Sequence, residues 1–256
     1  MPNQTNVRER VLNMLKQLHL PAMRQSFESL AYEANAESLS YEQYLLELLE
    51  REIESRKHNR INRLLQQSRL PLEKNLDVFD LNRLPPKVVR LVRSLLENHF
   101  VDKKENVLAF GNPGSGKTHL LCGIAQELIR KGRKVYFSSC SLLVQDLLRA
   151  KQELTLVKLI KKLARYDLLV IDDIGYVQQN REEMEVFFTL LAERYERGSV
   201  MITSNLPFSH WEKIFKDPMT TAAAIDRIVH HSVILELNIS SFRMEQAKSK
   251  KKQEKK

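Results

Sequence analysis

Glycine is scarce in this chain and unevenly placed. The 256 residues include only seven glycines, and none of them lies before Gly111. Hairpins and tight turns depend on glycine because it adopts positive φ without strain. The first 110 residues are therefore predicted to be helical and not hairpin-rich.

Cysteine and long hydrophobic runs are also rare. The two cysteines, Cys122 and Cys140, have no metal-site spacing and lie in apolar stretches, as core thiols in a reducing cytoplasm would. No apolar run approaches the ~18 residues of a membrane span, and the polar N-terminus is unlike a signal peptide. We expect a cytoplasmic protein with no membrane segment, long enough for one large and one small domain.

What the chain does contain is a phosphate-binding motif, G-x-x-x-x-G-K-[S/T]. Its residues are Gly111, Asn112, Pro113, Gly114, Ser115, Gly116, Lys117 and Thr118. An apolar run predicted as a strand leads into it, and a helical pattern beginning at His119 leads out, as this motif requires. The alternative is a glycine-rich turn with a solvated lysine.

In that context each part of the motif has a role toward a nucleotide. Backbone N–H groups would surround the phosphates at a helix N-terminus. Lys117 would reach the β- and γ-phosphates of ATP, and the Thr118 hydroxyl would bind Mg²⁺. His119, which follows Thr118 directly, is also expected to contact the nucleotide.

Strand and helix patterns alternate after the motif. This predicts an α/β fold whose five-stranded parallel sheet is covered by helices. The expected strands are 106–110, 134–138, 168–173, 200–205 and 233–237, with helices at 119–129, about 141–165 and 182–197.

Polar residues end two of these strands, at the edge where open α/β sheets bind ligands. Asp172 and Asp173 follow four apolar residues, a Walker-B pattern. Asp172 would hold Mg²⁺, and Asp173 would orient or deprotonate the attacking water. Asn205 would contact the γ-phosphate or the water. The alternatives are a turn with a helix cap for the two aspartates and an Asx turn before Pro207 for Asn205.

The N-terminal part is predicted to be helical, with a capping-box start at residues 40–43. One helical face is apolar: Tyr41, Tyr44, Leu45, Leu48, Leu49 and Ile53. The helix then turns basic at Arg56, Lys57, Arg60 and Arg63, which would be either a solvated face or a DNA-backbone contact. An earlier helix is expected to end near Pro21, and residues 71–86 are expected to be a linker. We thus expect a helical domain at 1–78, an ATPase domain at 79–243 and a basic tail at 244–256.

Two basic features remain in a chain of net charge +9. Residues 248–256 hold six lysines against one glutamate and would be disordered, as a solubilising tail or a nucleic-acid arm. The other lies on one helical face at spacings of three and four: Lys158, Lys161, Lys162 and Arg165. No aromatic residues alternate with it, so electrostatic, sequence-tolerant DNA contact is favoured over base stacking.

Several segments together resemble one family. They are residues 106–118, 166–176, 193–197, 203–208 and 226–231, with Leu20-Pro21-Ala22-Met23 near the N-terminus. In these the chain resembles the IstB-type transposition helper ATPases of insertion sequences, which are similar to DnaC-type replicative helicase loaders. The resemblance covers almost the whole chain. It implies an AAA+ fold with a helical N-terminal domain, binding to double-stranded DNA with little sequence preference, ATP-dependent assembly into a homo-oligomeric ring or filament, and activation of a cognate transposase.

The resemblance also implies roles for two arginines. Arg227 matches the arginine finger that acts on a neighbouring subunit's nucleotide, the alternative being a surface pair with Asp226. Arg243 matches a terminal motif and would be a second nucleotide sensor. Many relatives end the Walker-B strand in Asp-Glu, whereas this chain has Asp172-Asp173. The Asp173 side chain is shorter than glutamate by a methylene, so we expect poorer positioning of the attacking water and slower ATP hydrolysis.

Three functions fit these patterns: a transposition ATPase, a helicase loader and a small-molecule kinase. The kinase lacks an arginine-rich lid after the fourth strand and leaves the helical domain without a role. The first two share every nucleotide-site residue, and the neighbouring gene would distinguish them.

Overall fold

The chain is described here by a computed structural model covering residues 4–175, 181–207, 210–211 and 225–242. It divides into two compact units, Met1–Arg63 and Leu64–Lys256. None of the described helices is long and apolar enough to cross a membrane.

The first unit is helical, as its lack of glycine predicts. Its small core is formed by Met23, Leu30 and Leu48. The capping box is confirmed, because the Gln43 N–H donates to Ser40 Oγ at 3.3 Å and the Ser40 N–H donates to Gln43 Oε1 at 2.8 Å. The helices are α1 (Gln4–Gln17), α2 (Pro21–Glu37) and α3 (Tyr41–Ser68), of which α2 was covered by the general helical prediction but not placed individually.

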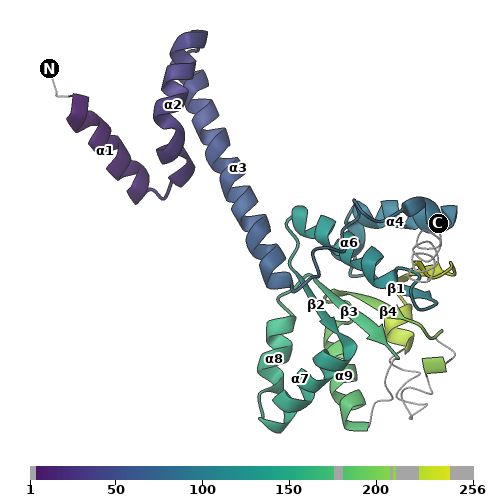
Figure 1. Cartoon of the computed structure of the whole chain (residues 1–256). Coiled ribbons are helices and arrows are strands. Elements are labelled where there is room, and N and C mark those ends of the chain that lie inside the picture. The colour runs from purple at the N-terminus through teal and green to yellow at the C-terminus, as the bar shows by residue number, and fades with distance from the viewer. Residues whose placement is uncertain (1–3, 176–180, 208–209, 212–224, 243–256) are drawn as a thin grey trace, which may run out of the picture. The chain divides into compact units, whose positions relative to one another are not determined.

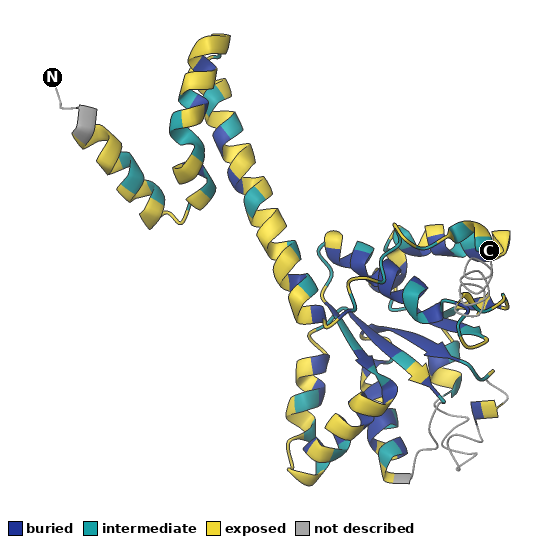
Figure 2. Cartoon of the chain, in the orientation of Figure 1, coloured by how far each residue is buried: buried dark blue, intermediate teal, exposed yellow. Residues whose placement is uncertain are grey.

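The expected apolar face of α3 is buried only in part. Tyr44 and Leu48 pack in the core, whereas Tyr41, Leu45, Leu49 and Ile53 are exposed. Three helices alone bury only a narrow strip of α3, and Figure 2 shows most of this helix as exposed or intermediate.

One buried carboxylate, Glu52 on α3, holds the start of α2. Its Oε2 accepts hydrogen bonds from the N–H groups of Ala22 and Met23 at 2.9 and 3.2 Å. These two N–H groups lie in the first turn of α2 and have no partner within the helix. Its Oε1 accepts from Arg56 Nε at 2.9 Å. Burial by itself raises the pKa of Glu52, but the hydrogen bonds from Arg56, Met23 and Ala22 bring that pKa below its ordinary value.

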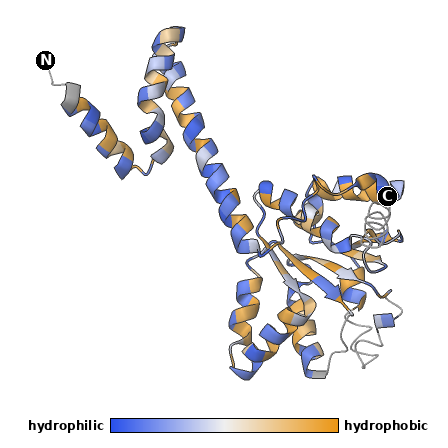
Figure 3. Cartoon of the chain, viewed as in Figure 1, coloured by the Kyte–Doolittle hydropathy of each residue, from blue (hydrophilic) through white to orange (hydrophobic). Residues whose placement is uncertain are grey.

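The second unit contains a five-stranded sheet of order β2-β3-β4-β1-β5, with every adjacent pair parallel. This confirms the expected fold class. Its strands are largely hydrophobic, as expected for a sheet covered on both faces, with polar residues toward some strand ends (Figure 3). The strands are β1 (Asn106–Gly111), β2 (Val135–Ser139), β3 (Leu168–Ile174), β4 (Ser199–Ser204) and β5 (Ser232–Leu237).

Helices α4 and α6 lie on one face of the sheet, and α7 and α9 lie on the other (Figure 1). The two helices expected near residues 141–165 are present as α7 and α8. The helices of this unit are η1 (Leu81–Arg83), α4 (Pro86–Leu96), α5 (His99–Asp102), α6 (Lys117–Arg130), α7 (Cys140–Gln152), α8 (Leu156–Leu163) and α9 (Arg181–Arg194).

The segment expected to be a linker, residues 71–86, instead packs against α6. A Cβ on Gly123 would lie 2.7 Å from Leu76, so this glycine provides the space for the segment. Gln126 Nε2 donates to the Lys74 carbonyl at 3.0 Å, and Leu84 is buried. The division into compact units accordingly falls after Arg63 and not near residue 78.

A buried arginine ties the N-terminal ends of β3 and β4 together. The Arg194 guanidinium donates to four carbonyls, among them Ser199 at 2.7 Å and Tyr166 at 2.8 Å. Burial lowers the pKa of Arg194 to about 10. A Cβ at Gly198 would lie 2.5 Å from Arg194 Nη2, so the guanidinium requires glycine there.

Replacing Glu52 with glutamine should loosen the start of α2 by about 1–3 kcal/mol, because the carboxylate accepts the two buried N–H groups. Since the folded-state pKa is lowered, this stabilisation is present at neutral pH and is lost as pH falls below the ordinary value of 4.5. Amide exchange of residues 22 and 23 in the whole protein measures it. Exposed Glu50 on the same helix, changed to glutamine, is the control; equal exchange in both variants would contradict the assignment.

Candidate nucleotide-binding site

The phosphate motif forms the loop between β1 and α6. Gly114 and Gly116 have φ of 80° and 93°, which favours glycine. A Cβ at Gly116 would lie 2.9 Å from Phe79 Cε2, and one at Gly114 would lie 2.2 Å from Ser241 Oγ. Because α6 begins at Lys117, its first N–H groups have no partner within the helix and face this loop. The loop has the form of a phosphate cradle.

Lys117 is buried at the base of the loop, 8% exposed. Its Nζ donates to the carbonyls of Gly111 and Asn112 at 2.8 and 3.0 Å. Burial lowers the pKa of Lys117, and the nearby Asp173 and Asp172 partly oppose that shift. The lysine is thus the cation that the motif predicts, held against the loop backbone.

The two predicted magnesium ligands are in direct contact. Thr118 Oγ1 donates to Asp172 Oδ1 at 2.8 Å. A hydroxyl and a carboxylate at this spacing fit Mg²⁺, which takes oxygen ligands and completes its octahedron with phosphate oxygens and water. No cluster of three or more His, Cys, Asp or Glu side chains occurs in the described ranges, so the protein alone would supply only part of the coordination.

Thr203, which the sequence analysis did not select, connects both aspartates. Its Oγ1 donates to Asp172 Oδ1 at 2.6 Å and accepts from the Asp173 N–H at 2.7 Å. It reaches them because β4 lies between β1 and β3. The signal that could have found Thr203 is a polar residue near the end of a buried strand, two positions before Asn205.

Asp173 has an unusual backbone. Its φ is +66°, and the β3–β4 register shifts between Ile171 and Ile174, so the two aspartates lie on an irregularity of the strand. Such irregularities re-aim side chains next to active sites. Desolvation raises the pKa of Asp173, the neighbouring Asp172 raises it further, and Lys117 opposes both. A carboxylate with a raised pKa is a better proton acceptor, as expected of a general base.

Asn205 and Ser115 carry buried side-chain oxygens without a hydrogen-bond partner in the described part of the chain. Asn205 directly follows β4, and Ser115 lies inside the phosphate loop. Buried polar atoms are nearly always paired, so these two oxygens point to a polar ligand at this edge of the sheet. The Asx turn considered for Asn205 does not form, because its Oδ1 is unpaired and Pro207 has no N–H.

His119 contacts the protein itself. Its Nε2 lies 2.8 Å from the Asn75 carbonyl oxygen, and its ring meets the edge of the Phe79 ring with centroids 5.2 Å apart. The structure therefore places His119 as a support for residues 75–79 beside the loop. Arg243 lies outside the described residues, but its neighbour Phe242 donates its N–H to the Gly114 carbonyl at 3.0 Å.

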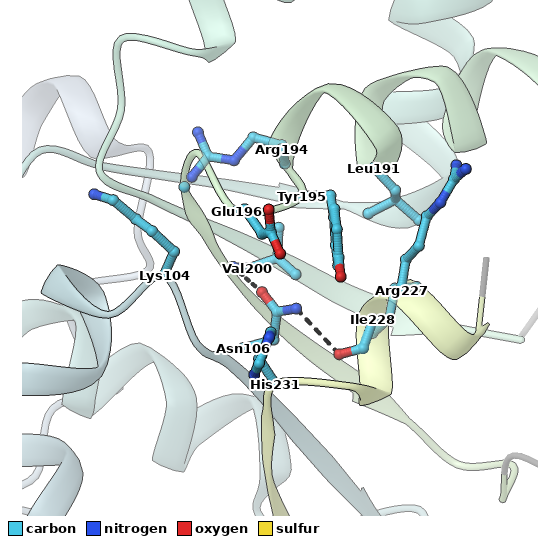
Figure 4. Close-up of a pocket in the computed structure, with 11 residues that line it drawn as sticks. Lys104, Asn106, Leu191, Arg194, Tyr195, Glu196, Val200, Arg227, Ile228 and His231 are labelled. Atoms are coloured by element: carbon cyan, nitrogen blue, oxygen red, sulfur yellow. Dashed lines mark hydrogen bonds between the residues drawn. The ribbon is translucent and has the colours of Figure 1, made fainter. Parts of the chain in front are cut away.

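Arg227 lies far from the phosphate loop of its own chain. It lines a cavity of about 20 Å³ with Asn106, the first residue of β1, whereas the loop begins at Gly111, the last. A six-residue strand separates its two ends by about 17 Å. Figure 4 shows the exposed Arg227 side chain extending away from Asn106. The alternative surface pair does not form, since no ion pair joins Asp226 and Arg227, both of which are described.

The predicted DNA-contacting residues fall on two helices. On α8 and just after it, Lys158, Lys161, Lys162 and Arg165 are all exposed, and none forms an ion pair with another described residue. On α3, Lys57, Arg60 and Arg63 are likewise exposed and unpaired within the described ranges. Arg56 differs, because it pairs with Glu52 and donates to the His19 carbonyl at 2.6 Å.

Known proteins match this chain along most of its length. Residues 13–251 match the family model described as IstB-like ATP binding protein. The ATP-binding protein of insertion sequence IS5376 from Geobacillus stearothermophilus is 36% identical over 249 residues, covering 97% of this chain and 99% of the relative. That of IS21 from Pseudomonas aeruginosa is 36% identical over 233 residues, covering 91% and 88%.

Solved structures share the fold. The DnaI structure superimposes with a TM-score of 0.57 at 22% identity, covering 67% of this chain and 95% of that one. The DnaC helicase loader gives 0.53 at 20% identity, covering 66% and 97%. DnaA bound to AMPPCP and single-stranded DNA gives 0.57 at 20% identity, covering 72% and 56%. These similarities confirm an AAA+ P-loop fold for the sheet-containing unit.

Changing Thr203 to valine keeps the size of the side chain and removes both hydrogen bonds to the aspartates. We expect Mg²⁺-dependent ATP affinity to fall by about 10- to 100-fold, because Asp172 loses a partner that orients it. Titration calorimetry with ATP, with and without Mg²⁺, measures this loss. Thr203→Ser restores the hydroxyl and should bind as the parent does; parental affinity in the valine variant would remove Thr203 from the site.

Proposed function

The chain belongs to the IstB-like ATP binding protein family, and on that premise we propose that it hydrolyses ATP, assembles on double-stranded DNA with little sequence preference, and activates the transposase of its insertion sequence. The relatives that match along nearly their whole length are insertion-sequence ATP-binding proteins, and a helper protein of this kind implies a transposase partner. ATP-dependent assembly on DNA implies a cytoplasmic location.

The observation that carries this proposal is the cluster of Thr118, Asp172 and Thr203 beside a glycine-lined loop. Mg²⁺ bound by Thr118 and Asp172 would neutralise charge on the nucleotide phosphates. Lys117 would add a fixed positive charge at the β- and γ-phosphates. Asp173 would accept the proton of the attacking water, and Asn205 would orient that water or the γ-phosphate through its unpaired oxygen.

The position of Arg227 is the reason that the proposal includes assembly of several subunits. It lies near the start of β1, at the opposite end of that strand from the phosphate loop, so it cannot serve its own nucleotide. A guanidinium is always ionised and stabilises charge that develops on the transferred phosphoryl group. We therefore propose that Arg227 acts on the nucleotide of the next subunit in a ring or helical filament.

Replicative helicase loading, as by DnaC-type proteins, is the second candidate, because it would use the same nucleotide-site residues. The 36% identity to insertion-sequence proteins favours transposition, since the loader structures share only the fold at 20–22% identity. The neighbouring gene discriminates: an integrase-type transposase supports the first function, and a replication operon supports the second.

The shared-site proposal predicts complementation between two inactive variants. Asp173→Asn should bind ATP and lose turnover, because it removes the base and keeps the magnesium ligand. Arg227→Ala should also keep ATP affinity and lose turnover, a loss in the transition state and not in binding. Mixed together, they should recover activity wherever an intact finger meets an intact Asp173. Phosphate release measured against subunit ratio tests this.

Lys117→Ala is the reference for that experiment. Removing the fixed cation should abolish ATP binding, so this variant should not supply an active site in any mixture. If Asp173→Asn and Arg227→Ala co-assemble on DNA and their mixture stays inactive, Arg227 does not act in trans.

Binding to DNA is expected to be electrostatic and to involve α8. Neutralising Lys158, Lys161 and Lys162 should weaken binding similarly on unrelated duplexes. It should also flatten the plot of log affinity against log salt by about 0.9 per lost phosphate contact. Fluorescence anisotropy at several salt concentrations measures both quantities.

Two further variants make the DNA experiment specific. Neutralising Lys87, Arg90 and Arg93, three exposed cations on α4, removes the same charge elsewhere and should leave the slope near the parental value. Neutralising Lys57, Arg60 and Arg63 tests the contribution of α3. An equal change in the α4 and α8 variants would show a net-charge effect and contradict a contact at α8.

A further inference from the structure

The helix that carries Arg227 is fixed at its C-terminal end by side chains from two strands. The described part of this helix covers residues 225–229, and the last carbonyls of the helix have no N–H partner within it. Asn106 Nδ2 donates to the Ile228 carbonyl at 3.1 Å, and Ser232 Oγ donates to the Val229 carbonyl at 3.0 Å. The main chain next to the finger is therefore held by hydrogen bonds from the sheet.

Asn106 makes two more bonds at the same place. Its Oδ1 accepts from the Val200 N–H of β4 at 3.0 Å, and its own N–H donates to the His231 carbonyl at 2.7 Å. The side chain is nearly buried, and Figure 4 shows its carboxamide bridging Val200 and Ile228. The carboxamide of asparagine offers a donor and an acceptor at these two positions, whereas an ionised aspartate of the same shape could only accept.

We propose that Asn106 is a positioning residue for Arg227, setting where the finger helix lies relative to β1 and β4. This inference rests on the proposed function, in which Arg227 acts on a neighbouring subunit. Ile228 anchors the helix in the core with its buried side chain, while Asn106 holds the carbonyl that follows Arg227 directly. Arg227 itself has no ion pair among the described residues, so the position of its backbone sets the region that the guanidinium can reach.

The position of Asn106 gives the finger a fixed relation to the sheet. Asn106 is the first residue of β1, and the phosphate loop begins at the last residue of that strand. In the proposed assembly, each subunit would therefore present Arg227 to one neighbour from one end of β1 and its own nucleotide to the other neighbour from the opposite end. A displacement of about 1 Å in a catalytic group can reduce turnover about 100-fold. Loss of the carboxamide should therefore reduce turnover through the finger and leave ATP binding intact.

The experiment measures on which side of the subunit interface Asn106 acts. Asn106→Ala should retain ATP affinity within about twofold and lose turnover by about 10- to 100-fold. Mixed with Asp173→Asn, which has an intact finger, it should recover activity. Mixed with Arg227→Ala, it should not recover, because neither partner then supplies a correctly placed finger.

The opposite pattern would overturn the proposal. If Asn106→Ala recovers with Arg227→Ala and not with Asp173→Asn, it damages its own nucleotide site through β1. Recovery with neither partner, while Arg227→Ala and Asp173→Asn complement each other, would also overturn it. Failure of that reference mixture alone would instead reject the trans finger, so the two ideas fail separately.

Two variants control for stability. Ser199 lies at the same end of the sheet, and its buried hydroxyl donates to the Phe100 carbonyl and makes no bond to the described part of the helix of Arg227. Ser199→Ala should therefore keep parental turnover. Ser232→Ala opens the neighbouring cap at a less buried site. It should show the same complementation pattern as Asn106→Ala with a smaller loss, and a parental rate in both Ser232→Ala and Asn106→Ala would reject control of the finger by these caps.

Discussion

The candidate nucleotide site is centred on one carboxylate oxygen, Asp172 Oδ1, which accepts hydrogen bonds from both Thr118 and Thr203. These three residues come from the start of α6, the end of β3 and the end of β4. Because β4 lies between β1 and β3, the phosphate loop and the aspartates are not on adjacent strands. Thr203 on the intervening strand bonds both aspartates, and Asn205 directly follows β4. The strand order thus determines which side chains can meet at the phosphates.

The two ends of the parallel strands have different tasks in the proposed mechanism. The C-terminal ends carry the loop, the aspartates and Asn205, while the N-terminal ends hold Arg194 and the Arg227 helix. A parallel sheet separates these groups by the length of a strand, about 17 Å for β1. Under the proposed mechanism, a single chain therefore keeps Arg227 away from its own nucleotide, and a neighbouring subunit would bring the two together.

Much of this arrangement was predictable from local patterns. The strand before the glycine motif, the helix after it and the apolar run ending in Asp172 and Asp173 depend on short-range spacing, and each was found where expected. The capping box at Ser40 is also a local device. The segment 71–86 was misjudged as a linker because its irregular pattern conceals contacts to Gly123 and Gln126, which are distant in sequence.

The sequence by itself determined the fold class, the phosphate loop and the carboxylates that accompany it, because each follows from periodicity or from residues adjacent in the chain. Only the tertiary structure decided that β4 separates β1 from β3, that Thr203 joins the aspartates, and that Arg227 and Asn106 share the opposite end of the sheet. The physical reason is that strand order and side-chain hydrogen bonds between distant segments arise from packing of the whole sheet, and local spacing carries no record of them.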